Sequence, residues 1–552
     1  MKFIKLFIVC ALLLPLSWSC KKFLDYKEAD YFNKDQVFFS FNRSKNFLTN
    51  IYSYLPTDFN SIDGAMRSSA SDDAVHVWDL SAIHRFNNGN WSPLQTLDDQ
   101  WGRLYTGIRA ANLFLKESDG QTFEDTRYND NYAQLMAQFK LYPYEARFLR
   151  AFFYFELIKR YGDVPLVTTL LTEQEANNVS KTPYDKVVDF IVSECDEISL
   201  YLPISYKSIP GAETGRATKG AALALKARAL LYAASPLHNV ENGQAKWIAA
   251  ATAAKAIIDL KSYTLDKDYA NIVNNLSSTE LIFETRQAAS NTFERANFPV
   301  GFEGGNTGTC PTQNLVDTYE MQATGKGIDE AGSGYNSNDP YKGRDPRMSK
   351  TILYNGSLWK NTIVQCWYGG FNGEPTENAT KTGYYLKKYV MESVSLSPVS
   401  PTTKIHVWVL FRYGEALLNY AEAMNEVYGP YTAGPAPLQM TANEAVKLVR
   451  SRAGMPGFPA GMTKEDFRNK LRNERRVELA FEDHRFWDIR RWKTGSSTTA
   501  IYGVEVTKDN SNSISYKRKL VETRVWDDKM NLYPISQNEL YLNKGLAQNP
   551  GW

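Results

Sequence analysis

The alanine-rich segment between Thr218 and Pro236 restricts the fold of this 552-residue chain more than any other feature. Alanine is the best helix former, and its small side chain lets the backbones of neighbouring helices approach closely. The alanines of this segment are Ala221, Ala222, Ala224, Ala227, Ala229, Ala233 and Ala234. We therefore predict a helix here that packs directly against other helices.

Helix start signals mark further segments. Thr182 is followed by a proline and then by Asp185, and apolar residues recur at helical spacing from there to residue 202. Thr463 and Asp466 repeat this capping pattern, and the apolar residues of 410–421 also recur at helical spacing. We predict a helix after each capping threonine and a third over 410–421.

Successive helices are predicted at 144–161, 218–236 and 246–260. This order suggests stacked helical pairs, as in tetratricopeptide-like arrays, although the sequence shows no strict repeat register. Three other regions are rich in Gly, Asn, Ser, Thr and aromatic residues and lack helical periodicity: 50–100, 290–400 and 495–535. The predicted fold is mostly α, with a scaffold of helical pairs, an irregular loop-rich half and a few short strands.

The amino terminus has the pattern of an export signal. Lys2 and Lys5 precede an apolar run over 6–16 that is too short to span a bilayer, and small residues then lead to Cys20. This arrangement resembles a bacterial lipobox, with Ser17 where a leucine is usual, and predicts a signal peptide at 1–19 and lipidation of Cys20. Ordinary cleavage near the same position is the alternative.

Charge and cysteine content exclude two classes of protein. Removal of residues 1–19 takes away two lysines and no acids, which leaves 61 basic and 61 acidic side chains. A neutral chain lacks the positive charge that binding to nucleic acid requires. Cys195, Cys310 and Cys366 are far apart and odd in number, so we expect neither a disulfide framework nor a zinc knuckle.

No motif for catalysis is present. The five histidines form no HExxH pattern, and the chain has no GxSxG elbow, P-loop or dinucleotide fingerprint. Glycoside hydrolysis needs two carboxylates, but among 61 Asp and Glu residues the sequence does not indicate which two would form such a pair. We expect no catalytic residues, no metal site and no cofactor. The Asp-rich loops could bind calcium, although no EF-hand spacing supports such a site.

Four segments carry a family resemblance. Residues 473–492 (NERRVELAFEDHRFWDIRRW) and the ending 533–552 are similar to the carboxy-terminal signatures of the SusD/RagB-like outer-membrane nutrient-binding lipoproteins of Bacteroidetes. Residues 412–423 and 449–454 fit the same family, so the resemblance spans essentially the whole chain. Asp483 stands where that family often has glycine.

The resemblance implies a single SusD-like unit over 20–552. Its helical scaffold would lie mainly at 24–50, 100–285 and 405–492, and its ligand-binding, loop-rich half mainly at 51–99, 286–404 and 493–552. It also implies a non-catalytic, cell-surface lipoprotein of the outer membrane, which binds an oligosaccharide and delivers it to a SusC-like TonB-dependent barrel transporter. A peptide-uptake receptor of the same family and a surface glycoside hydrolase remain as alternatives.

The ligand site is expected in two clusters of the loop-rich half. A sugar ring needs aromatic planes for its C–H face and polar groups for its hydroxyl rim. The first cluster contains Asp72, Asp73, His76, Trp78, Arg85, Asn90 and Trp91, and the second contains Trp359, Trp367 and Tyr368. Packing within the loops is the competing interpretation for these residues, whereas Trp101 opens a helical apolar stripe and is assigned to the core.

The charges of residues 473–492 have a structural interpretation. Acidic and basic side chains alternate along this predicted helix, a pattern typical of ion pairs within the helix and between helices, each worth about 0.2–0.5 kcal/mol on an exposed helix face. We therefore expect this segment to stabilise the fold and not to catalyse a reaction.

Overall fold

The structure is a computed structural model and describes residues 32–552. The predicted signal peptide and Cys20 lie outside these residues. Within residues 32–552, no helix has both the length and the apolar character needed to cross a membrane.

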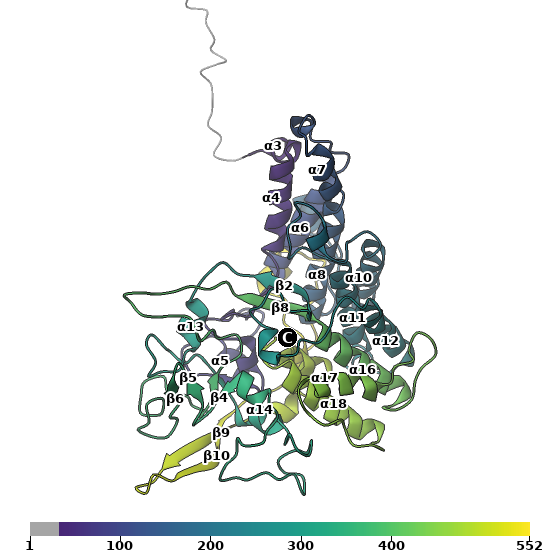
Figure 1. The fold of residues 1–552 in the computed structure, drawn as a ribbon. Helices are drawn as coiled ribbons and strands as arrows, with labels where there is room; N and C mark the ends of the chain where they lie inside the picture. Colours follow the sequence, from purple (N-terminus) through teal and green to yellow (C-terminus); the bar gives the residue numbers. More distant parts are fainter. Residues whose placement is uncertain (1–31) are drawn as a thin grey trace, which may run out of the picture.

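The described chain is mostly helical, which confirms the predicted fold class (Figure 1). Its longer helices are α4 (Phe41–Tyr52), α6 (Trp101–Glu117), α7 (Tyr132–Phe139), α8 (Tyr142–Tyr161), α10 (Tyr184–Ile198), α11 (Lys219–Ala234), α12 (Gln244–Asp259), α16 (Tyr413–Tyr428), α17 (Ala442–Arg452) and α18 (Lys464–Glu478). Shorter helices are α3 (Lys34–Phe39), α5 (His84–Asn87), α9 (Glu173–Ala176), α13 (Thr292–Asn297), α14 (Gln313–Thr318), α15 (Met348–Thr351), α19 (Arg485–Arg491) and α20 (Gln537–Leu542).

The long helices stack in sequence order, α6 on α8, α10 on α11, α11 on α12 and α12 on α16. Thr218 caps α11 by accepting a hydrogen bond from the Ala221 amide, and the alanines of α11 are buried against its neighbours. The alanines of α12 are mostly buried as well. Small side chains on both helices allow the close packing that the sequence predicted.

Two helix boundaries differ from the prediction. Pro183 and not Thr182 is the N-cap of α10, and the Asp163 carboxylate accepts the hydrogen bond from the Tyr184 amide. Residues 407–412 form strand β8, so the third predicted helix begins only at Tyr413. Residues 407–411 are an unbroken apolar run, which periodicity alone cannot assign to a helix or a strand. The pairing of β8 with β2 makes this run a strand.

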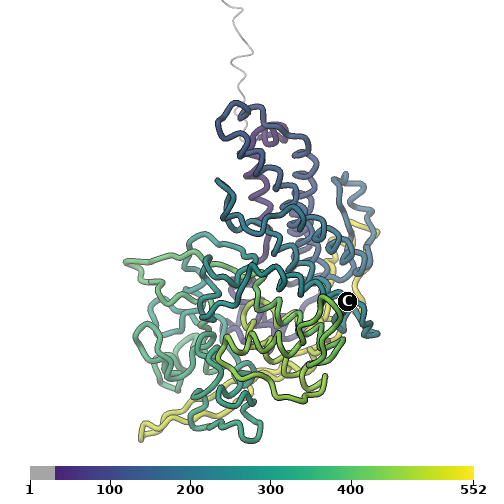
Figure 2. The backbone as a smooth tube through the Cα atoms, turned by 45° about the vertical axis from the view of Figure 1, so that its right-hand side comes forward, coloured from purple at the N-terminus to yellow at the C-terminus, as the bar shows by residue number. Residues whose placement is uncertain are grey.

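The strands form short antiparallel pairs. Within residues 32–552 these pairs are β1 (Ala74–His76) with β3 (Thr309–Pro311), β2 (Leu281–Arg286) with β8 (Val407–Arg412), β4 (Ile352–Leu353) with β7 (Tyr385–Leu386), β5 (Leu358–Trp359) with β6 (Thr362–Ile363), and β9 (Ala500–Lys508) with β10 (Ile514–Thr523). Figures 1 and 2 both show the β9–β10 hairpin projecting at the end of the molecule opposite α3 and α7.

A continuous hydrophobic core joins the two halves. Phe283 of β2 packs edge-on against Phe148 of α8, with 5.1 Å between ring centroids. Phe411 of β8 packs against Phe152 of the same helix at 5.9 Å. The β2–β8 pair therefore packs directly on α8.

The signature segment 473–492 is not one helix. The chain leaves α18 and turns before α19, with Phe481 at φ 60° and Asp483 at φ 61°, in the left-handed region. Glycine adopts this conformation without steric cost, which explains the residue that the family often has in place of Asp483. Here Asp483 instead forms an ion pair with Arg67 at 2.8 Å.

The charges of this segment form the predicted ion pairs, but most of them are buried, so the magnitude for an exposed helix face does not apply. Glu478 and Glu482 both bind Arg412, and Glu474 and Glu478 both bind Arg347 from the loop-rich half, at 2.6–2.7 Å. Each of these side chains is at most 2% exposed. This buried ion cluster, to which Arg450, Arg452, Lys388 and Glu280 also belong, ties α18 to segments far away in the sequence.

Candidate functional site

The first predicted cluster begins with two buried aspartates. Asp72 accepts hydrogen bonds from Arg485 at 2.8 and 2.9 Å, and Asp73 accepts one from Arg476 at 2.6 Å. Burial opposes ionisation of Asp72, but the guanidinium groups of Arg476 and Arg485 hold the pKa of its carboxyl well below the ordinary value. Both aspartates therefore brace their loop against the signature segment, and neither is free to meet a ligand.

His76 and Trp78 lie side by side. His76 in β1 is fully buried, and its ring centroid lies 4.8 Å from that of Trp78. Burial lowers the pKa of His76 to about 3, so the imidazole is neutral at physiological pH. Trp78 is half-buried, and its indole N–H donates to the carbonyl of Asn306 at 2.8 Å.

The remaining residues of this cluster separate in the structure. Arg85 donates to the carbonyls of Asn90 and Gln95 and so holds its own loop, while the Asn90 side chain is exposed. Trp91 is only 4% exposed and packs against Trp552, with 4.6 Å between ring centroids. An enclosed indole has no free face for a sugar, so the assignment of Trp91 to the site is wrong in this conformation.

The second cluster also divides into buried and exposed residues. Trp359 in β5 is 1% exposed and is enclosed beside Phe298, which removes it from the candidate site. Trp367 is half-buried, whereas Tyr368 is 73% exposed and Phe371 46% exposed. Sequence reasoning missed Phe371, although its position three residues after Tyr368 in a glycine-rich loop was the available signal.

The segment 365–374, called the aromatic loop below, is anchored to its surroundings. Asn372 is buried; its side-chain carbonyl accepts from the Gln365 amide at 2.9 Å, and its side-chain N–H donates to the Val300 carbonyl at 2.6 Å. A Cβ on Gly373 would lie 2.0 Å from the Trp367 carbonyl oxygen, so the loop needs glycine there. The exposed aromatic faces are therefore carried by a loop of defined shape.

One cation lies next to this loop. The Lys508 Nζ of β9 is 4.9 Å from the centroid of the Trp367 ring, within range of a cation–π contact. Phe302 packs edge-on against Phe371, with 5.6 Å between ring centroids. The loop thus places aromatic planes beside a positively charged side chain.

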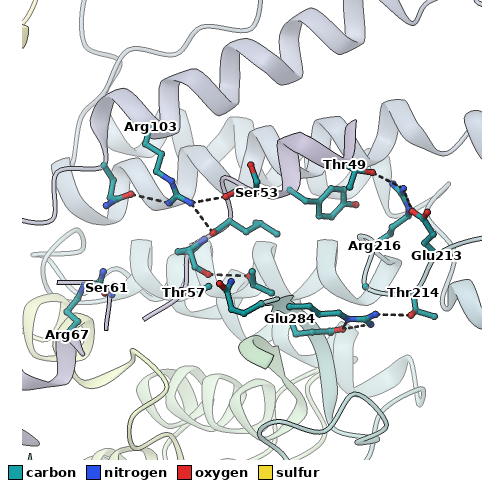
Figure 3. Close-up of a pocket in the computed structure, with 18 of the residues that line it drawn as sticks. Thr49, Ser53, Thr57, Ser61, Arg67, Arg103, Glu213, Thr214, Arg216 and Glu284 are labelled. Atoms are coloured by element: carbon teal, nitrogen blue, oxygen red, sulfur yellow. Dashed lines mark hydrogen bonds and ion pairs between the residues drawn. The ribbon is translucent and has the colours of Figure 1, made fainter. Parts of the chain in front are cut away.

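A separate polar cleft of about 710 Å³ lies between α4, α6 and β2 (Figure 3). Its lining includes the hydroxyl groups of Thr49, Ser53, Thr57, Ser61, Thr214 and Thr285, the amides of Gln100 and Gln287, and the guanidinium groups of Arg103 and Arg286. None of the predicted site residues lines this cleft. Sequence reasoning had no signal for it, because its walls come from segments far apart in the chain.

The described part of the chain contains no group of three or more His, Cys, Asp or Glu side chains placed to hold a metal ion. The three cysteines in that part are buried thiols.

Comparison with known proteins identifies the family. A family model described as the SusD family matches residues 273–552, slightly more than half of the chain. The chain belongs to the SusD family. A second model, described as starch-binding and associating with the outer membrane, matches residues 22–231, so SusD-type models cover both halves.

Relatives of the SusD type match over nearly the full length. SusD-like protein P25 of Formosa agariphila is 25% identical over 98% of this chain and 97% of its own. The crystal structure of a SusD-like protein from Bacteroides fragilis is 27% identical, with a TM-score of 0.77 over 94% of this chain and 98% of that one. A SusD-like carbohydrate binding protein from the same organism is 25% identical, with a TM-score of 0.72 over 93% of this chain and 100% of that one.

Proposed function

We propose that this SusD-family protein is a non-catalytic receptor that binds an oligosaccharide on the aromatic loop. The observation that carries the proposal is the exposure of Tyr368 and Phe371 beside Trp367 on an anchored, glycine-containing loop. Flat aromatic rings that face solvent side by side match the C–H face of a sugar. The carbohydrate-binding relative from Bacteroides fragilis supports the same ligand class.

Trp78 extends the proposed site. The segment 300–306 lies between Trp78 and the aromatic loop, since Asn306 accepts from the Trp78 indole and Val300 accepts from Asn372. The side chain of Asn378 donates to that of Asn306 at 2.8 Å and adds an amide to this region. An oligosaccharide would therefore meet aromatic planes and amide groups along one connected stretch of loops.

Binding measurements test this proposal. The double variant Tyr368→Ala/Phe371→Ala should lose retention of an oligosaccharide in affinity electrophoresis, because each stacked ring contributes about 0.5–1.5 kcal/mol beyond its buried area. Tyr128→Ala is the matched control, since Tyr128 is 92% exposed on a different part of the molecule. Equal retention by both variants across a broad glycan panel would exclude the aromatic loop.

The same assay separates the alternatives. Retention of glycan without cleavage supports a receptor, whereas steady release of shorter sugars identifies a hydrolase. Retention of peptides in place of glycans identifies a peptide-uptake receptor.

We propose further that lipidation of Cys20 anchors the protein at the cell surface of the outer membrane, where it delivers its ligand to a SusC-like TonB-dependent transporter. The family description of association with the outer membrane supports this location. Cys20→Ala should move the protein into the soluble fraction, because the lipid chains supply the anchoring free energy. Affinity purification from native membranes should recover a barrel transporter with the unmodified protein.

A further inference from the structure

The polar cleft differs in chemistry from the aromatic loop. Hydroxyl, amide and charged side chains dominate its described lining, and Tyr52 is the one aromatic residue there. The Tyr52 hydroxyl donates a hydrogen bond to Glu145 at 2.6 Å, so this hydroxyl is already occupied within the protein. The volume of about 710 Å³ lies within the usual range of ligand sites. This cleft can hold a hydroxyl-rich ligand, but it offers little surface for stacking.

Most arginines of the cleft are neutralised by buried acids. Arg67 forms ion pairs with Asp98 at 3.1 Å and with Asp483 at 2.8 Å. Arg216 pairs with Glu145 at 3.0 Å, and Arg160 pairs with Glu156 at 2.6 Å. These guanidinium groups are committed to the fold.

Arg103 is the exception. Its guanidinium donates to the carbonyls of Ser53 and Leu55 at 3.0 and 3.3 Å and to the Gln100 side chain at 3.2 Å. Within residues 32–552 no carboxylate forms an ion pair with it. The Arg103 side chain is exposed and lines the cleft, so its charge is accessible to an anion that enters the cleft.

Arg286 spans the opposite part of the cleft. Its guanidinium is held by Glu284 at 2.7 Å and donates to the Thr214 hydroxyl at 3.0 Å (Figure 3 labels both partners). Gly215, at φ +87°, permits this contact, because a Cβ there would lie 2.9 Å from the Arg286 guanidinium carbon. A second cleft of about 280 Å³ shares this contact as part of its lining.

We propose that the polar cleft binds an acidic saccharide, a sugar that carries a carboxylate or a sulfate, with Arg103 as the contact for the anionic group. Guanidinium groups form charge-assisted hydrogen bonds with both anions, and the contacts of Arg103 within residues 32–552 use Nη1 and Nη2 and leave its Nε–H for such a bond. The hydroxyl and amide lining matches the ring hydroxyls. The choice of a saccharide as the carrier of the anion rests on the proposed function. The choice of the cleft as the anion site rests on its own lining residues, none of which belongs to the aromatic loop.

Calorimetric titration of the full-length protein tests the proposal. One pair of probes is an oligogalacturonate and its methyl-esterified form, which share a backbone and differ in charge. The other pair is a sulfated galactan oligosaccharide and its desulfated form. We expect one acidic probe to bind more tightly than its neutral counterpart at low salt and the difference to shrink at high salt.

Variants locate this binding. Arg103→Gln should weaken the acidic probe about tenfold or more, because a hydrogen bond to a charged group is lost, and Arg103→Lys should retain part of the affinity. Arg127→Gln, the same change at a surface arginine outside the cleft, should have no effect. Gln287→Glu adds a negative charge to the lining without changing its size, and should weaken the acidic probe even if Arg103→Gln unfolds.

The outcomes separate the two proposals. Three results would refute the polar cleft as an acidic-sugar site. The acidic and neutral probes bind with equal affinity, the acidic probes do not bind, or neither cleft substitution changes the affinity for the acidic probes. Loss of neutral glycans in Tyr368→Ala/Phe371→Ala tests the aromatic loop alone. Acidic binding that depends on Arg103 in a protein without any neutral ligand would support the cleft while refuting the aromatic loop.

Discussion

Replacement of Arg412 by methionine should destabilise the protein strongly. Arg412 is 1% exposed and donates to Glu280, Glu478 and Glu482 at 2.5–2.7 Å. Methionine keeps much of the side-chain length but removes the charge, which leaves three buried carboxylates with one cation fewer. Loss of one partner of a buried ion pair typically costs about 3–5 kcal/mol.

The lower end of that range is expected for Arg412→Met, because each carboxylate keeps another partner. Glu482 retains Lys388, Glu478 retains Arg347, and Glu280 retains Arg452 at 3.3 Å. The free energy of unfolding, measured by urea titration at pH 7, should fall by about 3 kcal/mol. Arg127→Met removes an exposed ion pair and should leave the urea midpoint unchanged.

The deficit of Arg412→Met should also depend on pH. Burial opposes ionisation of Glu482, but Arg412 and Lys388 lower its folded-state pKa below the ordinary value. Such a group stabilises the fold above its unfolded pKa, and this contribution is lost as pH falls through the folded pKa. The deficit should therefore be largest at neutral pH and smaller in acid. A deficit independent of pH, or a variant as stable as Arg127→Met, would refute the assignment of this cluster to the stability of the fold.

Three further predictions follow from local geometry. Trp91→Ala should cost about 3–5 kcal/mol of stability, visible as a lowered melting temperature, because it opens a cavity beside Trp552; an unchanged melting curve would contradict the burial. His76 should stay neutral in NMR titration of histidine-labelled protein down to about pH 4, since burial lowers its pKa to about 3. Because the unfolded chain binds this proton near pH 6.5, stability should fall as pH drops below that value. Thr463→Ala should lower the free energy of unfolding by about 1 kcal/mol through loss of the hydrogen bond from the Asp466 amide to the Thr463 hydroxyl, whereas Thr463→Ser should retain it.

The candidate site was predicted only in part. Sequence reasoning placed candidate aromatic residues in the loops, and Trp367 and Tyr368 remain in the proposed site. Trp91 and Trp359 carry the same local signals, namely an indole among Gly, Asn and Asp residues. Their burial depends on Trp552 and Phe298, which lie far away in the sequence. No local pattern distinguishes an indole that faces solvent from one that another segment covers.

The sequence by itself determined the helical scaffold and the family. The caps at Thr218 and Thr463 and the alanines of α11 act within a few residues, so propensity and periodicity were enough to predict these helices. Tertiary structure decided the strand at 407–412, the burial of the charges in 473–492 and the polar cleft. Each depends on pairing, desolvation or enclosure by distant segments, and the free energy of such contacts is not encoded in any one stretch of chain.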